Sequence, residues 1–98
     1  VPGVSIDLTL EAGGGAIYVW GRLDPPAWDV PTVAEIIDEG GRALLLYGMS
    51  EGDGRFHMNT PEAGVRLDPG RYTVQVFTSG SENAAETESE LRLVELDV

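Results

Sequence analysis

The chain has 98 residues, of which 42% are hydrophobic and 23% charged. This is the composition of one small folded domain with one core, and not of a disordered segment. It contains no cysteine, which excludes disulfides, thiolate metal sites, cysteine nucleophiles and iron–sulfur clusters. The longest apolar run, Ala43 to Tyr47, is too short for a membrane span or for the apolar part of a signal peptide. We therefore expect a single domain over residues 1–98 with no membrane partner.

The charge of the chain is strongly acidic. Seventeen Asp and Glu residues oppose six basic residues, all of them arginine, and the formal net charge is −11. Such a charge repels phosphate backbones and argues against direct nucleic-acid binding. It favours a basic protein partner attracted by electrostatic steering, although a compositional bias of the whole genome produces the same excess of acids. The chain begins at Val1-Pro2 without a methionine, so we expect that some N-terminal sequence has been removed.

The first predicted elements form a hairpin. Residues 4–10 alternate between apolar and polar, which predicts a strand with Val4, Ile6, Leu8 and Leu10 facing inward. The glycine-rich stretch 12–15 predicts a turn, because glycine accepts the positive φ angles of hairpins. Residues 16–21 then form the return strand.

Residues 24–31 contain three prolines and are predicted to be a loop, because proline lacks a backbone donor and fixes φ. Trp28 lies within this loop. We expect it to close one end of the core. The alternative is an exposed aromatic anchor, since tryptophan is frequent at the centres of protein interfaces.

Residues 32–39 fit two structures. Thr32 and Glu35 have the spacing of a helix capping box, which allows a short helix near 32–39. The β-branched residues and the turn at 38–41 favour a hairpin instead, and we choose the hairpin. It leads into the apolar run 43–47, which suggests a central strand covered on both faces.

The second half of the chain is predicted to contain short strands and turns. An exposed loop at 50–54 precedes an extended piece at 56–58, a turn at 60–64 and another extended piece at 65–67. The Asp68-Pro69-Gly70 turn leads into the clearest strand, 71–78, with Tyr72, Val74, Val76 and Thr78 on one face. Residues 79–89 are expected to form a mobile loop.

The last strand is predicted to pair antiparallel with 71–78. Residues 90–93 and 94–98 each alternate, but out of phase, and one bulge near Leu93 and Val94 reconciles them. The count is then seven to eight short strands. This number and spacing predict an all-β fold, a small antiparallel β-sandwich or barrel.

Catalytic groups are sparse. His57 is the single histidine, and no nucleophile motif or second histidine accompanies it. Glu51 and Asp53 lie in a glycine-rich loop that lacks the spacing of a calcium loop, and at most they form a weak surface cation site. General acid–base catalysis needs a carboxyl group with a raised pKa, which usually requires burial. The acids of this chain are instead expected at solvated positions. In turns these are Asp24, Asp38, Glu39, Asp53 and Asp68, and at outward strand positions they are Asp7, Glu90 and Glu95. We expect no enzyme, no metal and no cofactor.

Two stretches carry a resemblance to a known family. One is the turn and strand at 67–76, followed by an acidic loop and the terminal strand 91–98; the other is Trp28 ahead of an apolar hairpin. Together they resemble small bacterial β-sandwich proteins that include the competence-protein-J-type nuclease inhibitor and its actinobacterial relatives. The resemblance covers about half of the chain. It implies a cytoplasmic or phage-borne inhibitor that binds another protein and has no catalytic residues.

Three functional hypotheses follow. The first is an inhibitor or immunity-type protein whose carboxylates imitate a nucleic-acid backbone and engage a nuclease, toxin or nucleic-acid-binding defence complex. The second is a structural or adhesive module of a secreted or virion protein, in which the acidity serves solubility. The third is a carbohydrate-binding domain that stacks sugars on Tyr18, Trp20 and Trp28. Free strand edges also allow a homodimer. The partner-binding residues predicted for the first hypothesis are Glu82, Glu86, Glu88, Glu90, Glu95 and Trp28.

Overall fold

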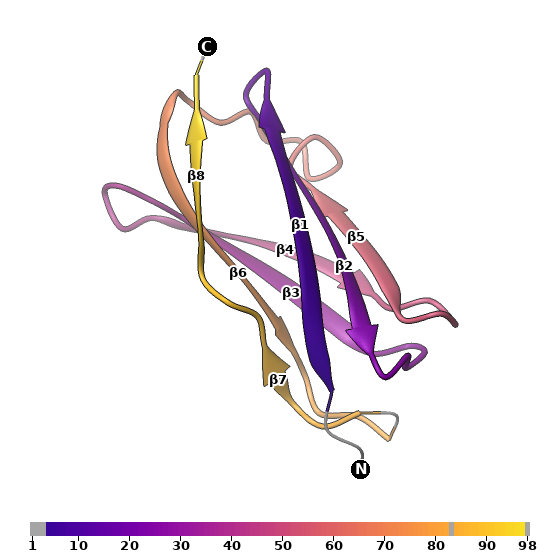
Figure 1. Ribbon diagram of the computed structural model, residues 1–98. Coiled ribbons are helices and arrows are strands. Elements are labelled where there is room, and N and C mark those ends of the chain that lie inside the picture. The colour runs from indigo at the N-terminus through magenta and orange to yellow at the C-terminus, as the bar shows by residue number, and fades with distance from the viewer. Residues whose placement is uncertain (1–3, 83, 98) are drawn as a thin grey trace.

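A computed structural model describes residues 4–82 and 84–97 of the chain. This part of the chain contains eight β-strands and no helix, and the strands form two antiparallel sheets packed face to face (Figure 1). The prediction of a small antiparallel sandwich is confirmed. The strands are β1 (Ser5–Gly13), β2 (Ala16–Asp24), β3 (Pro31–Asp38), β4 (Ala43–Met49), β5 (Arg55–Asn59), β6 (Gly70–Thr78), β7 (Thr87–Glu88) and β8 (Arg92–Leu96).

The two sheets differ in width. One has three strands in the order β1-β2-β5. The other has the order β4-β3-β6, and β6 also pairs with both β7 and β8. On one side of the sandwich β1 lies against β7 and β8, and on the other side β4 lies against β5. The Arg92 side chain joins the sheets on the first side, where Nη2 donates a hydrogen bond to the Leu8 carbonyl over 3.2 Å.

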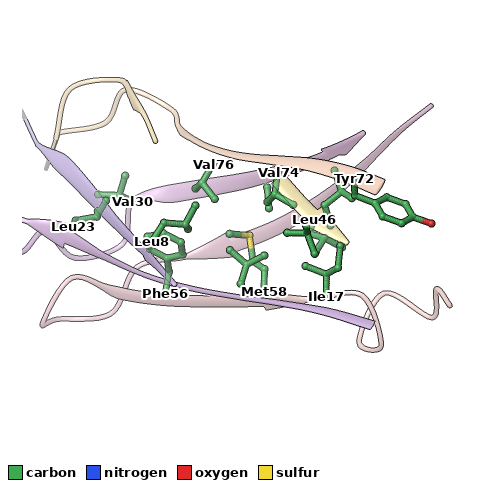
Figure 2. Close-up of a cluster of buried hydrophobic side chains, with 14 of the residues drawn as sticks. Leu8, Ile17, Leu23, Val30, Leu46, Phe56, Met58, Tyr72, Val74 and Val76 are labelled. Carbon is green, nitrogen blue, oxygen red and sulfur yellow. The ribbon is translucent and has the colours of Figure 1, made fainter. Parts of the chain in front are cut away.

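The core lies between the sheets and receives every second side chain of the longer strands, because successive residues of a strand point to opposite faces. The strongest alternation is in β6, where Tyr72, Val74, Val76 and Thr78 are buried. Figure 2 shows how side chains from both sheets meet; the residues labelled there are Leu8, Ile17, Leu23, Val30, Leu46, Phe56, Met58, Tyr72, Val74 and Val76.

Several predicted elements are present. The opening hairpin is formed by β1 and β2, whose register runs unbroken from Ser5 opposite Asp24 to Gly13 opposite Ala16. The ambiguous segment is a strand and not a helix, since β3 pairs with β4 on one side and β6 on the other. These two ladders satisfy the backbone of β3 without a helix, and they place its alternate side chains in the core.

The apolar run 43–47 is not a central strand, and that prediction is wrong. β4 pairs only with β3 among the described strands, so it is an edge strand. Leu46 points into the core and is 3% exposed, whereas Leu45 is 43% and Tyr47 72% exposed. The run is apolar on both faces, but only one of the faces is covered.

The extended piece predicted at 65–67 pairs with no described strand and lies in the connection between β5 and β6. Two further predictions need correction. The segment 79–89 is not simply a polar loop, since it contains β7 and the fully buried Ala84. Trp28 does not close the core either, as described below.

The bulge predicted near Leu93 and Val94 is not there, because the pairing of β6 with β8 is unbroken from Arg92 to Leu96. An extra residue lies instead between β7 and β8. Phe77 of β6 pairs with Glu88 of β7, whereas Val74 of β6 pairs with Arg92 of β8. The four residues from 74 to 77 on β6 are therefore matched by five residues from 88 to 92 on the other side, which is one extra residue. Ser89 secures this point, because its N–H donates to the Val76 carbonyl and its Oγ accepts the Val76 N–H.

A tyrosine at the start of β6 ties the incoming connection to the sheet. Tyr72 is 7% exposed, and its hydroxyl donates a 2.5 Å hydrogen bond to the carbonyl of Asp68, four residues earlier. This hydrogen bond resembles the tyrosine corner found in immunoglobulin-like sandwiches, and we use that term for it. Burial raises the pKa of the Tyr72 hydroxyl above its ordinary value, and the nearby carboxylates of Asp68, Asp38 and Glu39 raise it further.

Replacing Tyr72 by Phe removes this hydrogen bond, and we expect the free energy of unfolding at neutral pH to fall by about 1–2 kcal/mol. The pH dependence follows from the raised pKa. Stability from the protonated hydroxyl is complete below the pKa of an unfolded tyrosine and is lost as the pH rises through the folded value. Urea unfolding at neutral and at alkaline pH tests both points. Y47F, at an exposed position, is the matched control; equal losses in the two variants would contradict the assignment.

A glycine in β2 makes room for a core aromatic ring. Gly21 pairs with Phe56 of β5, and a Cβ atom at Gly21 would overlap the Phe56 ring. Because Phe56 is only 3% exposed, the ring has no solvent into which it could move. The small residue in an otherwise β-prone strand is therefore required by packing.

Replacing Gly21 by Ala is expected to lower the free energy of unfolding by about 1–3 kcal/mol, the usual cost of overpacking a core. The G21A/F56L double variant should recover part of the loss that G21A causes, because the smaller side chain frees space. G13A serves as the control, since nothing lies within 4 Å of a Cβ atom there. Thermal unfolding followed by circular dichroism measures all three, and a neutral G21A would contradict the packing argument.

Candidate interaction surfaces

The groups considered for catalysis are not assembled into a site. His57 lies exposed on β5, and its ring stacks on Trp20 with centroids 5.1 Å apart and planes inclined by 23°. Asp53, in the loop considered for a cation, accepts the Arg55 N–H at 3.1 Å and pairs with the Arg55 side chain at 3.4 Å. Residues 4–82 and 84–97 hold no cluster of three or more His, Asp or Glu side chains that could bind a metal.

The acids predicted to bind a partner occupy two places. Four of them lie on the segment that runs from the end of β6 through β7 towards β8, and all four are exposed: Glu82, Glu86, Glu88 and Glu90. Glu95 is on β8, and its carboxylate accepts a 2.9 Å hydrogen bond from Arg71 Nε. Arg92 lies 3.8 Å from Glu90. The structure therefore groups four of the five predicted acids and separates Glu95 from them.

Trp28 is exposed, so the prediction that it plugs the core is wrong. Its side chain is 63% exposed, whereas Ala27 and Val30 on either side are buried. The loop that carries it is fastened by Ser50, which directly follows β4. Ser50 Oγ donates to the Ala27 carbonyl at 2.6 Å and accepts the Val30 N–H at 2.9 Å. Ser50 also exchanges backbone bonds with Asp29 and Val30.

The aromatic side chains do not form the flat sugar platform that the third hypothesis needs. Tyr18 stacks on Trp20 with centroids 5.9 Å apart and an angle of 14°, and His57 stacks on Trp20 as well. Trp20 therefore has neighbouring rings against its faces, whereas sugars stack on a free aromatic face. Trp28 lies outside both sheets, in the loop between β2 and β3.

The outer face of the five-stranded sheet is mostly apolar, and sequence reasoning missed it. Pairing places Tyr47, Val33 and Phe77 side by side across β4, β3 and β6. The neighbouring row contains Leu45, Glu35 and Gln75. The signal was present in the run 43–47, but it was attributed to burial on both sides. We call the outward side chains Val33, Ile37, Leu45, Tyr47, Met49, Phe77 and Leu93 the apolar face.

This surface is unusual in a chain with a net charge of −11, since its apolar side chains include Tyr47, which is 72% exposed, and Leu93, which is 77% exposed. Next to the apolar face, Glu35 is the charged residue among the outward positions of β3 and β4, and its side chain is half-buried. The outward acids and Arg71 lie towards the β7 and β8 side.

Replacing Ser50 by Ala should lower the free energy of unfolding by about 1–3 kcal/mol, because the Val30 N–H would stay buried without an acceptor. The change should also loosen the loop that carries Trp28. In a W20F background, Trp28 fluorescence anisotropy measures this loosening, and urea unfolding measures the stability. S79A, at an exposed position, is the control. An S50A protein with unchanged anisotropy would show that Ser50 does not hold the loop.

No helix in the part of the chain that the structure describes has the length and apolar character needed to cross a membrane. No protein-family model matches the sequence, and no curated protein matches it either. A solved structure, described as a tetra-tandem repeat in the extending region of a large adhesion protein, is similar in fold, with a TM-score of 0.66 and 12% sequence identity. The match covers 99% of this chain and 24% of that one, so this chain spans about a quarter of the structure that it resembles.

Proposed function

We propose that the chain is a structural module of an adhesion-type protein, one unit of a row of sandwiches joined end to end. The observation that carries this proposal is the likeness of 99% of the chain to about a quarter of a tetra-tandem repeat from the extending region of an adhesion protein. At 12% identity the likeness concerns the fold. The function is therefore argued from the geometry of the chain ends and the strands.

The chain ends suit an end-to-end row. The molecule is elongated, with extents of 41 × 21 × 18 Å. β1 begins at one end of the long axis, and β8 runs towards the other end, where the chain leaves the sandwich (Figure 1). A following unit attached there would extend the row, with about 40 Å added per module.

The strands are oriented to resist tension along that axis. A pull on Val4 and Asp97 acts along β1 and β8, because both strands run in the direction of the long axis (Figure 1). β1 faces β2 over nine residue pairs, and β8 faces β6 over five. Tension parallel to paired strands loads many hydrogen bonds together, whereas tension across them breaks the bonds one after another.

The acidity has a role in this proposal that needs no basic partner. Like charges on adjacent modules repel one another, so a row of units with a net charge of −11 each stays extended and dissolved. Such a protein works outside the cell, in contrast to the cytoplasmic location expected from the inhibitor resemblance. A basic protein partner stays a prediction, and its strongest support is the grouping of Glu82, Glu86, Glu88 and Glu90 on one exposed segment.

Single-molecule force spectroscopy tests the proposal. Handles are attached through S5C and D97C, which is feasible because the chain has no other cysteine. Unfolding should be one event that adds about 280 Å, since the chain from Ser5 to Asp97 reaches ~3.5 Å per residue and replaces a folded length of at most 41 Å. The unfolding force should be several-fold higher than in a geometry that peels the strands apart.

The peeling geometry is available in the same molecule. Ser5 and Asp24 face each other in the β1–β2 pair, so handles at S5C and D24C pull this pair apart one bond at a time. Both double-cysteine proteins must first show the unfolding temperature of the parent chain. If end-to-end tension unfolds the module at forces as low as the peeling geometry does, the chain is not built to carry load and the proposal is wrong.

A further inference from the structure

β4 is an edge strand without the features that normally protect an edge from pairing. Its seven residues, from Ala43 to Met49, include no charged residue and no proline. Its register with β3 is unbroken from Pro31 opposite Met49 to Ile37 opposite Ala43, so no bulge distorts it. Proteins usually guard exposed edges with charges, prolines or bulges, and an unguarded edge accepts another strand.

The other edges are guarded. β1 carries Asp7 and Glu11. β5 carries Arg55 and the exposed His57. β8 carries Arg92 and Glu95. The absence of charge is therefore specific to the β4 edge among the described strands.

We propose that the β4 edge pairs with β4 of a second copy of this chain, in antiparallel orientation, to form one continuous sheet across a two-fold axis. This inference rests on the β4 geometry and is independent of the proposed function. Two copies with a net charge of −11 each repel one another over most of their surface. The uncharged β4 edge allows close approach without placing like charges opposite each other.

The sequence of β4 is self-complementary in this orientation. Pairing all seven residues places the two-fold axis at Leu46, so that Leu45 of each copy faces Tyr47 of the other, and Ala43 faces Met49. Leu45 and Tyr47 are 43% and 72% exposed in the single chain. Aromatic side chains opposite aliphatic ones are favourable cross-strand pairs, and the apolar faces of the two copies become continuous.

Charges at the two ends of the strand complement each other. In the same register Arg42 lies opposite Ser50 of the partner copy, next to Glu51 of that copy. Arg42 and Glu51 are both exposed, and the salt bridges of the described residues include neither side chain. The two-fold axis produces this contact twice, so two reciprocal ion pairs flank the uncharged strand.

The nearest acid within the sheet does not oppose the contact. Glu35 lies on β3, opposite Leu45. The two copies of Glu35 are separated by three strand spacings, which is about 14 Å. This exceeds the screening length of ~8 Å at physiological salt. One pair of strands is a small interface, so we expect a weak dimer with a dissociation constant above roughly 1 μM.

Sedimentation equilibrium of the chain over a concentration series tests the proposal. The parent chain should show a monomer–dimer equilibrium, and Y47K should weaken dimerisation about tenfold or more, since an edge lysine opposes strand addition. L93K is the matched control, because Leu93 is 77% exposed on β8, at the edge of the same sheet that lies farthest from β4, and should leave the dimer unchanged. Circular dichroism must show that each variant is folded.

Charge exchange at the strand ends distinguishes the proposed register from general attraction or repulsion. E51R makes the chain less negative by two units, so it would strengthen any association limited by net charge. The proposed register predicts the reverse, because Arg42 would then face an arginine. R42E should also weaken the dimer, and the R42E/E51R double variant, which has the parent net charge of −11, should restore it.

Three results would overturn the proposal. The first is a parent chain that stays monomeric up to about 1 mM, a concentration well above the dissociation constant expected of a small interface. The β4 edge would then pair with a strand of another protein or with none. The second is a loss of dimer in L93K as large as that in Y47K. The third is a stronger dimer in E51R. None of these results affects the test of end-to-end load bearing.

Discussion

The interior of this sandwich is filled by alternate side chains from two sheets, and that single requirement determines where the other side chains lie. A strand that gives every second residue to the core must present the remaining residues to the surface. In β6 the outward residues are Arg71, Thr73, Gln75 and Phe77. Acids placed at such positions stay solvated at no cost to the core. The net charge of −11 is therefore compatible with a tightly packed apolar interior.

The same requirement makes the sides of the sandwich its weak points. A small core supplies limited stability, so the closing contacts at the sides matter more than they would in a larger domain. On one side the Arg92 side chain bonds the Leu8 carbonyl and connects the sheets. On the other side, no strand pairs with the outer edge of β4 among residues 4–82 and 84–97. The tyrosine corner at Tyr72 and the Ser50 bonds fasten two of the connections between strands.

Much of the fold could be predicted from the sequence, because alternation and turn residues are local signals. The hairpin of β1 and β2 and the strand β6 followed from such patterns, whereas the bulge was expected at Leu93 and Val94 and the extra residue lies before β8. The position of β4 could not be predicted in this way. An apolar run looks the same whether its second face is covered or exposed, and only the order of strands in the sheet decides between the two.

The interaction surfaces were harder to predict than the strands. The exposure of Trp28 depends on Ser50, which is 22 residues further along the chain and holds the loop through its hydroxyl and backbone. No local pattern encodes such a contact. The acids of the 82–90 segment were identifiable as a group, because they lie close together in the sequence. Glu95 was placed with them by composition alone, and the pairing of β8 with β6 separates it from them.

The bonds at Ser50 have a consequence for communication within the molecule. Ser50 follows the last residue of β4 and at the same time anchors the loop that presents Trp28. We therefore expect a displacement or stiffening of β4 to reach the Trp28 loop through bonds of 2.6–3.0 Å. With Trp20 replaced by Phe, Trp28 is the single tryptophan of the chain, and its fluorescence then reports on the β4 edge without any added label.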